Sequence, residues 1–107
     1  MKLIILALVF SSIFLTACSG KYDSFATCLT EKGAVMYGTD WCSHCKAQKE
    51  LFGRSFRNII YVNCDKAPDQ CDAAGVEGFP TWVIGNQSSS GTQPLDKLAV
   101  MTGCQLA

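Results

Sequence analysis

The spacing of apolar residues predicts four helices, because in four segments these residues recur on one face every three or four positions. The predicted helices cover residues 22–33, residues 42–56, a short stretch that ends at Gly75, and residues 94–103. In the second helix Cys45, Phe52 and Phe56 fall on one stripe, while most of the charged residues face water. Gly53 is a weak point inside that helix, since glycine is a poor helix former.

Short apolar runs predict the strands between these helices. Residues 34–37 and 59–62 are each expected to form a buried strand. Residues 81–85 and a weaker segment at 91–93 are expected to pair as a hairpin, with "NQSSS" as its turn. The order helix, strand, helix, strand, helix, strand, strand, helix predicts a small α/β sheet covered on both faces.

The N-terminus has a different pattern, a run of thirteen mainly apolar residues from Leu3 to Leu15 that follows Met1 and Lys2. A helix that spans a membrane needs roughly 20 such residues, so the run is too short to span and predicts a secretory signal peptide. Two alternatives stay open: cleavage of an ordinary signal peptide after Ala17, and a short membrane anchor.

The next residues, "LTAC" from Leu15 to Cys18, resemble the bacterial lipoprotein signal, in which small residues precede a cysteine that is lipidated. The resemblance implies that residues 1–17 are removed, that Cys18 carries the lipid, and that residues 18–21 are a short tether to a domain at 22–107. We therefore expect an exported protein, lipid-anchored on the periplasmic or extracytoplasmic side of a membrane. Ser19 to Lys21 reach only about 10 Å, which holds the domain at the bilayer.

The balance of charged residues bears on which macromolecules or surfaces the protein binds. The chain of 107 residues carries nine Lys and Arg against nine Asp and Glu, and loss of Lys2 with the signal leaves a net charge of −1. A nucleic acid or an anionic surface is therefore not indicated as a partner.

Cysteine is abundant for a domain of this size. Besides Cys18 there are six: Cys28, Cys42, Cys45, Cys64, Cys71 and Cys104. An even number in an exported domain implies disulfides, whose fifteen possible connectivities spacing alone does not resolve. Cross-links are expected because a domain of about 90 residues has a marginal core.

Two motifs, "WCSHC" after the first strand and "GFPT" before the hairpin, resemble the thioredoxin fold. More narrowly, "MYGTDWCSHCKAQKELFG", "YVNCD", "GFPTWVI" and "MTGC" are similar to the thioredoxin-like domain found fused behind bacterial and plant vitamin K epoxide reductase homologues, and also free-standing. The resemblance covers residues 22–104 and implies a central mixed sheet of about four strands with helices on both faces.

The resemblance places Pro80 where thioredoxin folds have a cis-proline beside the redox couple, with the Phe79 backbone facing the Cys42 sulfur. There it would hydrogen-bond an extended substrate segment. An ordinary trans-proline turn is the alternative.

Cys42 and Cys45 are the candidate catalytic residues, because the start of a helix gives two thiols at this spacing different reactivities. At a helix start, unpaired N–H groups and the helix dipole lower the pKa of the Cys42 thiol and make it the nucleophile. Cys45, one turn on and facing inward, resolves the mixed disulfide. Trp41, Ser43 and His44 surround the couple; His44 either stabilises the Cys42 thiolate, as in strongly oxidising thiol oxidases that carry a histidine there, or faces solvent without effect.

One position departs from the family pattern. Thioredoxin has a buried acid in the strand before the motif, which relays a proton to the second cysteine, and Met36 stands there in this chain. Asp40 and Glu50 are near in sequence but are given no role.

The resemblance also implies a disulfide between Cys64 and Cys71, either structural or relaying electrons to the couple. Cys28 and Cys104 are then left to pair by elimination. Zinc is the rival use of so many cysteines, and we expect no metal because the spacings do not provide two close pairs. Trp41 is expected on the active-site surface and Trp82 in the core.

These features predict a membrane-anchored thiol-disulfide oxidoreductase that acts on protein thiols, needs no cofactor beyond its cysteines, and is reoxidised by a quinone-linked membrane partner of the vitamin K epoxide reductase type. Two alternatives stay open. One is a reductant for exported cysteines, as in cytochrome or copper-site maturation. The other is a non-catalytic lipoprotein that binds metal through Cys42 and Cys45.

Overall fold

The computed structural model describes residues 20–106 of the chain. Its helices are α1 (Asp23–Glu31), α2 (Ser43–Phe52), the 3₁₀ helix η1 (Gly53–Asn58), α3 (Pro68–Ala73) and α4 (Leu95–Thr102). Its strands are β1 (Ala34–Gly38), β2 (Ile60–Asn63), β3 (Thr81–Ile84) and β4 (Gln87–Ser90). The predicted signal peptide, residues 1–17, and the predicted lipid site Cys18 lie outside the described residues. Within residues 20–106, every helix is too short or too polar to cross a membrane.

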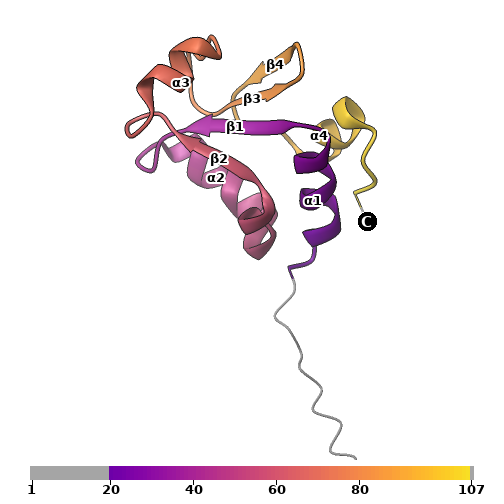
Figure 1. Cartoon of the computed structure of the whole chain (residues 1–107). Coiled ribbons are helices and arrows are strands. Elements are labelled where there is room, and N and C mark those ends of the chain that lie inside the picture. Colours follow the sequence, from indigo (N-terminus) through magenta and orange to yellow (C-terminus); the bar gives the residue numbers. More distant parts are fainter. Residues whose placement is uncertain (1–19, 107) are drawn as a thin grey trace, which may run out of the picture.

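The four strands form one mixed sheet in the order β2-β1-β3-β4. Strand β1 is parallel to β2 and antiparallel to β3, and β4 pairs antiparallel with β3. In the view of Figure 1, α1 and α2 lie below β1 and α3 lies above it. The predicted thioredoxin-type fold is confirmed, and β1 and β3 are its two inner strands.

The second helix is shorter than predicted. Helix α2 ends at Phe52, and Gly53 adopts φ 58° and ψ −134° before the chain continues as η1. Glycine takes a positive φ at little cost because it has no Cβ. The apolar stripe that reaches Phe56 is therefore shared between two helices with a break at Gly53.

Two predictions about strands were wrong. Strand β2 lies at the edge of the sheet and leaves Ile60 44% exposed, so its apolar run does not mark a strand buried on both faces. The hairpin turns at Gly85 and Asn86, and the polar segment Gln87–Ser90 is strand β4. Pairing with β3 outweighs the low strand preference of serine at this edge.

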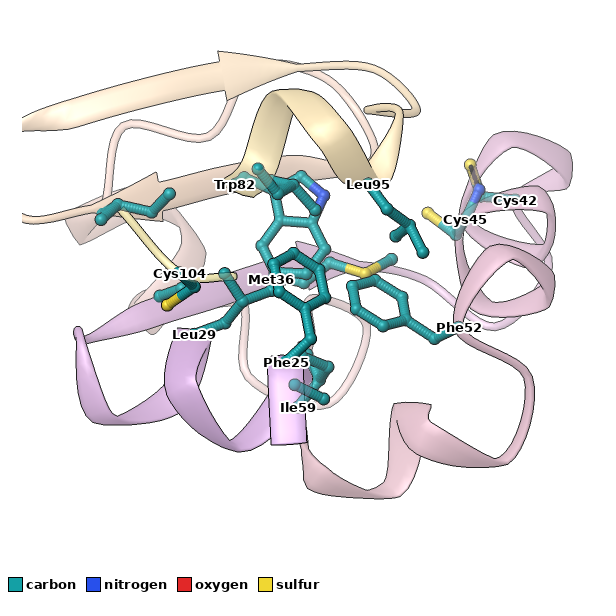
Figure 2. Close-up of a cluster of buried hydrophobic side chains, with 14 residues drawn as sticks. Phe25, Leu29, Met36, Cys42, Cys45, Phe52, Ile59, Trp82, Leu95 and Cys104 are labelled. Carbon is teal, nitrogen blue, oxygen red and sulfur yellow. Dashed lines mark hydrogen bonds between the residues drawn. The ribbon is translucent and has the colours of Figure 1, made fainter. Parts of the chain in front are cut away.

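The core lies between the sheet and the helices α1, α2 and α4 (Figure 2). The Phe52 ring lies 6.2 Å from the Phe25 ring and 5.9 Å from the Trp82 ring, measured between centroids. Met36 and Trp82, which are cross-strand partners, are both fully buried. The expectation that Trp82 belongs to the core is confirmed.

A buried amide joins α2 to the opposite side of the core. Gln48 is fully buried, and its Oε1 accepts hydrogen bonds from the Trp82 indole N–H at 3.0 Å and from the Gln93 backbone N–H at 2.6 Å. Its Nε2 donates to the Gln93 carbonyl at 3.0 Å. Since buried polar groups are costly when unpaired, this network fixes α2 against β3 and the segment before α4.

Two disulfides cross-link the domain. Cys28 of α1 is bonded to Cys104 beyond α4, across 76 positions, and Cys64 after β2 is bonded to Cys71 of α3, across seven. The structure thus contains the pair that the resemblance implied and the pair left by elimination. The Cys28–Cys104 bond joins the first helix to the residues after the last helix, whereas the Cys64–Cys71 bond closes a short loop between β2 and α3.

We expect the substitution Gln48→Leu to lower the free energy of unfolding by about 3 kcal/mol, because it leaves the Trp82 N–H and both Gln93 backbone groups without partners. Urea unfolding followed by tryptophan fluorescence would measure the change. Gln70→Leu, the same substitution at an exposed site of α3, is the matched control and should stay within about 0.5 kcal/mol. Equal effects of the two substitutions would contradict a stabilising role of the network.

Loss of the long disulfide should cost more than loss of the short one. In the chain-entropy model, Cys28→Ala with Cys104→Ala destabilises by about 4 kcal/mol, and Cys64→Ala with Cys71→Ala by about 2 kcal/mol. Urea unfolding without reductant would compare the two double variants. The reverse order of stabilities would show that strain or packing, and not loop closure, governs these bonds.

Candidate active site

Strand β1 and helix α2 together position the two free thiols. Strand β1 ends at Gly38, a short loop follows, and Cys42 is the N-cap residue of α2. The Cys42 Sγ accepts a hydrogen bond from the Cys45 backbone N–H at 3.3 Å, as a capping side chain does. Cys42 is 8% exposed and Cys45 is fully buried, so the first thiol lies at the surface and the second beneath it (Figure 2).

Gly38 allows α2 to approach the end of β1. A Cβ at this position would lie 2.7 Å from the Cys45 Sγ and 3.4 Å from a ring carbon of Tyr61. Any side chain here would push the second cysteine away from the strand. The glycine is thus required by the place of the cysteine and not by a turn.

The cis-proline loop lies across the couple, as predicted. The Phe79–Pro80 bond is cis, and the Cys42 thiol donates to the Phe79 carbonyl at 3.6 Å. Pro80 is fully buried and Phe79 half-buried. The Phe79 backbone therefore faces the Cys42 sulfur.

The surroundings separate the two thiols electrostatically. Partial burial acts to raise the pKa of Cys42, but hydrogen bonds from the Cys45 side chain and from the backbone N–H groups of Cys45 and His44 lower it below its usual range. Burial, with the hydrogen bond to Cys42, raises the pKa of Cys45 to about 11. At neutral pH the Cys42 sulfur is the better nucleophile and the Cys45 thiol is protonated.

His44 and Ser43 lie on the solvent side of the helix start. Both are exposed, and the His44 imidazole makes no hydrogen bond to any residue between 20 and 106. His44 acts on Cys42 through its backbone N–H, and its carbonyl accepts a hydrogen bond from the Thr92 hydroxyl at 2.9 Å. The predicted support of the thiolate by the His44 side chain stays a prediction, because only the backbone N–H of this residue acts on Cys42 in the structure.

Trp41 forms the exposed rim of the site. Its side chain is 66% exposed, and its indole N–H donates to Asp65 at 2.8 Å. Its ring meets the Phe79 ring edge to face, with centroids 6.3 Å apart. Because Asp65 follows Cys64, this bond links the rim to the loop of the short disulfide.

Two residues near Cys45 escaped the analysis of the sequence. Met36 is fully buried and carries no charge, and the charged or polar groups beside the second cysteine are instead Lys49 and Tyr61, with Asp40 beyond them. The four-residue spacing from Cys45 to Lys49 was a usable signal, since such residues share a helix face. Tyr61 could be placed only once β2 was paired with β1, opposite Met36.

The buried Thr39 hydroxyl has no hydrogen-bond partner among the described residues. In residues 20–106, no three or more His, Cys, Asp or Glu side chains come together in a way that would hold a metal ion. In the part of the chain that the structure describes, the four cysteines outside the couple are all in disulfides.

Comparison with known sequences gives the same assignment as the geometry. The sequence model of the family Thioredoxin matches residues 21–100. The thiol-disulfide oxidoreductase LTO1 of Arabidopsis thaliana is 41% identical over 106 residues, which cover 87% of this chain and 28% of LTO1. A protein disulfide-isomerase of Aspergillus niger is 34% identical over 71 residues, 58% of this chain and 14% of the isomerase. The chain thus spans less than a third of either relative.

Solved structures show the same fold. Mitochondrial thioredoxin 3 of Saccharomyces cerevisiae superposes with a TM-score of 0.54 at 18% identity, over 65% of this chain and 74% of that one. Thioredoxin NaTrxh of Nicotiana alata gives a TM-score of 0.54 at 17% identity, over 64% and 70%. With the matched family model and the paired thiols at a helix start, the chain belongs to the thioredoxin family and carries the dithiol of a thioredoxin-type thiol-disulfide oxidoreductase.

Proposed function

We propose that this chain is an exported, membrane-anchored oxidoreductase that introduces disulfides into protein substrates through Cys42 and Cys45 and is reoxidised by a quinone-linked membrane reductase. The observation that carries the proposal is the contrast between the two thiols. Cys42 has a lowered pKa and meets the surface beside the Phe79 carbonyl, while Cys45 is buried with a raised pKa. A nucleophile and a shielded resolving thiol are what disulfide exchange requires.

The exchange follows from this arrangement. A substrate thiolate attacks the Cys42 sulfur of the oxidised couple, so that the Cys42–Cys45 bond breaks and Cys45 leaves as a thiolate. A second substrate thiolate then attacks the substrate sulfur of the mixed disulfide, and Cys42 leaves as a thiolate. The substrate gains one disulfide, the couple gains two electrons and takes up its protons from solvent, and a disulfide of the membrane partner reoxidises it by the same exchange in reverse.

The direction of electron flow is supported by the stabilised Cys42 thiolate. Groups that stabilise this thiolate favour the reduced couple and make its disulfide a stronger oxidant. Cys42 receives such stabilisation from the Cys45 side chain and from main-chain N–H groups at the start of α2. Met36 fills the place where a reducing thioredoxin carries its proton-relaying acid.

Membrane attachment is supported by the apolar run and the "LTAC" segment. The contacts of residues 20 and 22 determine where such a tether would leave the domain. The Gly20 N–H donates to Asp23 at 2.9 Å, and the Tyr22 N–H donates to the Ser55 hydroxyl at 2.8 Å. Ser55 lies in η1, just beyond the C-terminal end of α2, whereas Cys42 caps the N-terminal end. The ten residues of α2 separate these ends by about 15 Å, so an anchored domain would turn the couple away from its tether.

The partner assignment draws on the relatives. The name of the Arabidopsis thaliana relative states thiol-disulfide exchange, and the chain covers 28% of that protein. The similarity to domains fused behind vitamin K epoxide reductase homologues supports a membrane partner of that type.

The reduction potential of the Cys42–Cys45 couple tests the proposed direction. We expect a value between about −120 and −180 mV for a disulfide donor. It would be measured by equilibration in glutathione buffers, using the full chain in detergent with Cys18→Ser to remove the remaining thiol. A value at or below about −270 mV would reverse the assignment to a reductant, and a Cys42→Ser chain is the control for exchange outside the couple.

The two thiols should differ in how their alkylation depends on pH. Iodoacetamide should modify Cys42 at a pH below the usual range of a thiol, whereas Cys45 in a Cys42→Ser chain should react only well above that range. Mass spectrometry of peptides from the reduced couple would follow both sites. Equal alkylation of both cysteines at pH 7 would contradict the division into nucleophile and resolving thiol.

Substitution of the resolving cysteine should trap substrates. In a Cys45→Ser chain the Cys42 thiolate can attack a disulfide of a substrate protein, but no internal thiol can then displace the mixed disulfide, so reductant-sensitive adducts should accumulate with exported proteins. Nonreducing gels of cells that express this variant would show them. Adducts that persist in a Cys42→Ser/Cys45→Ser chain would mean that another cysteine reacts.

A further inference from the structure

This inference rests on the proposed exchange. The buried second thiol presents a difficulty for that exchange. Cys45 leaves as a thiolate when a substrate attacks the couple, and it must become a thiolate again when it attacks a mixed disulfide at Cys42. Yet it is fully buried, and the β1 residue that it lies against is Gly38, which has no side chain. A thiolate at such a site needs a nearby positive charge or hydrogen-bond donors.

A positive charge lies one helical turn from Cys45. Lys49 follows at the fourth position along α2, where side chains share a helix face. Its ammonium nitrogen lies 4.2 Å from the centroid of the Tyr61 ring and 5.5 Å from that of Phe56. The Lys49 side chain is only 30% exposed, so its field is screened less than that of a free surface lysine.

Tyr61 and Asp40 hold this lysine beside the couple. The Lys49 Nζ lies 3.6 Å from Asp40 Oδ1, and the Tyr61 hydroxyl donates to the same oxygen at 3.0 Å. The Tyr61 ring and the Cys45 sulfur flank one point above Gly38, at 3.4 and 2.7 Å. Lys49, Tyr61 and Asp40 therefore form a cluster, called here the lysine cluster, that borders the buried sulfur.

The other charges around Cys45 do not replace Lys49. On this face of the sheet the strands contribute Met36, Gly38 and Trp82, none of which is charged. Asp65 and Lys66 lie in the loop after β2. The charge of Asp65 acts to raise the pKa of Tyr61, and the charge of Lys66 acts to lower the pKa of Asp40. Burial and Cys42 raise the pKa of Cys45, while Lys49 and the Thr39 backbone lower it.

We propose that Lys49, held by Tyr61 and Asp40, stabilises the Cys45 thiolate each time the Cys42–Cys45 bond forms or breaks. In the forming direction the Cys45 proton goes to solvent, the thiolate attacks the Cys42 sulfur, and the other sulfur of the mixed disulfide leaves as a thiolate. In the breaking direction Cys45 is the leaving group. A fixed cation favours the same thiolate in both directions, so the role does not depend on the direction of electron flow.

The reaction of the reduced chain with 5,5′-dithiobis(2-nitrobenzoate) separates the two steps. In the first phase Cys42 attacks the reagent, releases one thionitrobenzoate and retains the other as a mixed disulfide. In the second phase Cys45 displaces that group and closes the Cys42–Cys45 bond. The full chain with Cys18→Ser, in detergent, would be followed by absorbance from pH 6 to pH 11.

We expect Lys49→Met to slow the second phase about fivefold at pH 7, the effect of one nearby charge at an intermediate dielectric, and to leave the first phase within about twofold. The loss should narrow as the pH approaches about 11, the pKa of Cys45 with Lys49 in place. Lys49→Arg should restore the second phase to within about twofold, because it keeps the charge. Lys46→Met is the matched control, an exposed lysine on the same helix, and should leave both phases unchanged.

A double substitution tests whether Tyr61 acts through Lys49. Tyr61→Leu should slow the second phase, and adding it to Lys49→Met should cause little further loss, because the lysine that it holds is gone. Additive losses would overturn the holding role. A second phase of wild-type rate in Lys49→Met, or a loss that Lys49→Arg does not restore, would overturn the role of Lys49, whereas absence of a second phase in the parent chain would overturn the exchange function itself.

Discussion

The close approach of helix α2 to the end of strand β1 is the constraint on which the redox site depends. It is possible because position 38 has no side chain: a Cβ there would lie 2.7 Å from the Cys45 sulfur. The contact buries the second thiol and leaves the first at the helix cap, so a single approach between two elements creates the difference in reactivity. The Phe79–Pro80 loop then closes over the first thiol from the side of β3.

A polar interaction on the same side of the helix also holds it in this place. Gln48 lies three residues after Cys45 and forms hydrogen bonds with the Trp82 indole and with both backbone groups of Gln93. These bonds are directional, so they fix the rotation of α2 about its axis as well as its distance from the sheet. The redox couple thus lies on a helix that packs on β1 where the Cys45 sulfur meets Gly38, and that is hydrogen-bonded to β3 through the Gln48 amide.

The sequence was sufficient for the features that local rules determine. The Cys-x-x-Cys at a helix start, the Phe-Pro-Thr segment and the number of strands all followed from motif and periodicity, and the fold that they implied was found. The errors arose where a long-range contact decided the outcome. The apolar run at 59–62 forms an edge strand, and the serines at 88–90 form a strand because β3 is available to pair with them.

The least predictable part of the site was the set of groups around Cys45. Glu50 is exposed and plays no part, while Asp40 enters only through Tyr61, a contact between residues 21 positions apart. No pattern in the sequence indicates that β2 would place a tyrosine beside the cysteine. A missing acid at Met36 could be noticed from the sequence, but what stands near the thiol in its place required the sheet register.

The bond between Cys28 and Cys104 also determines how the domain responds to mechanical force. It encloses the sheet, the helix of the couple and the short disulfide within one covalent loop of chain. Tension applied to the two ends of the described segment would therefore pass from α1 directly to the residues after α4, and would extend only the few residues outside the loop. The redox site lies outside the path of the load as long as this one bond stays oxidised.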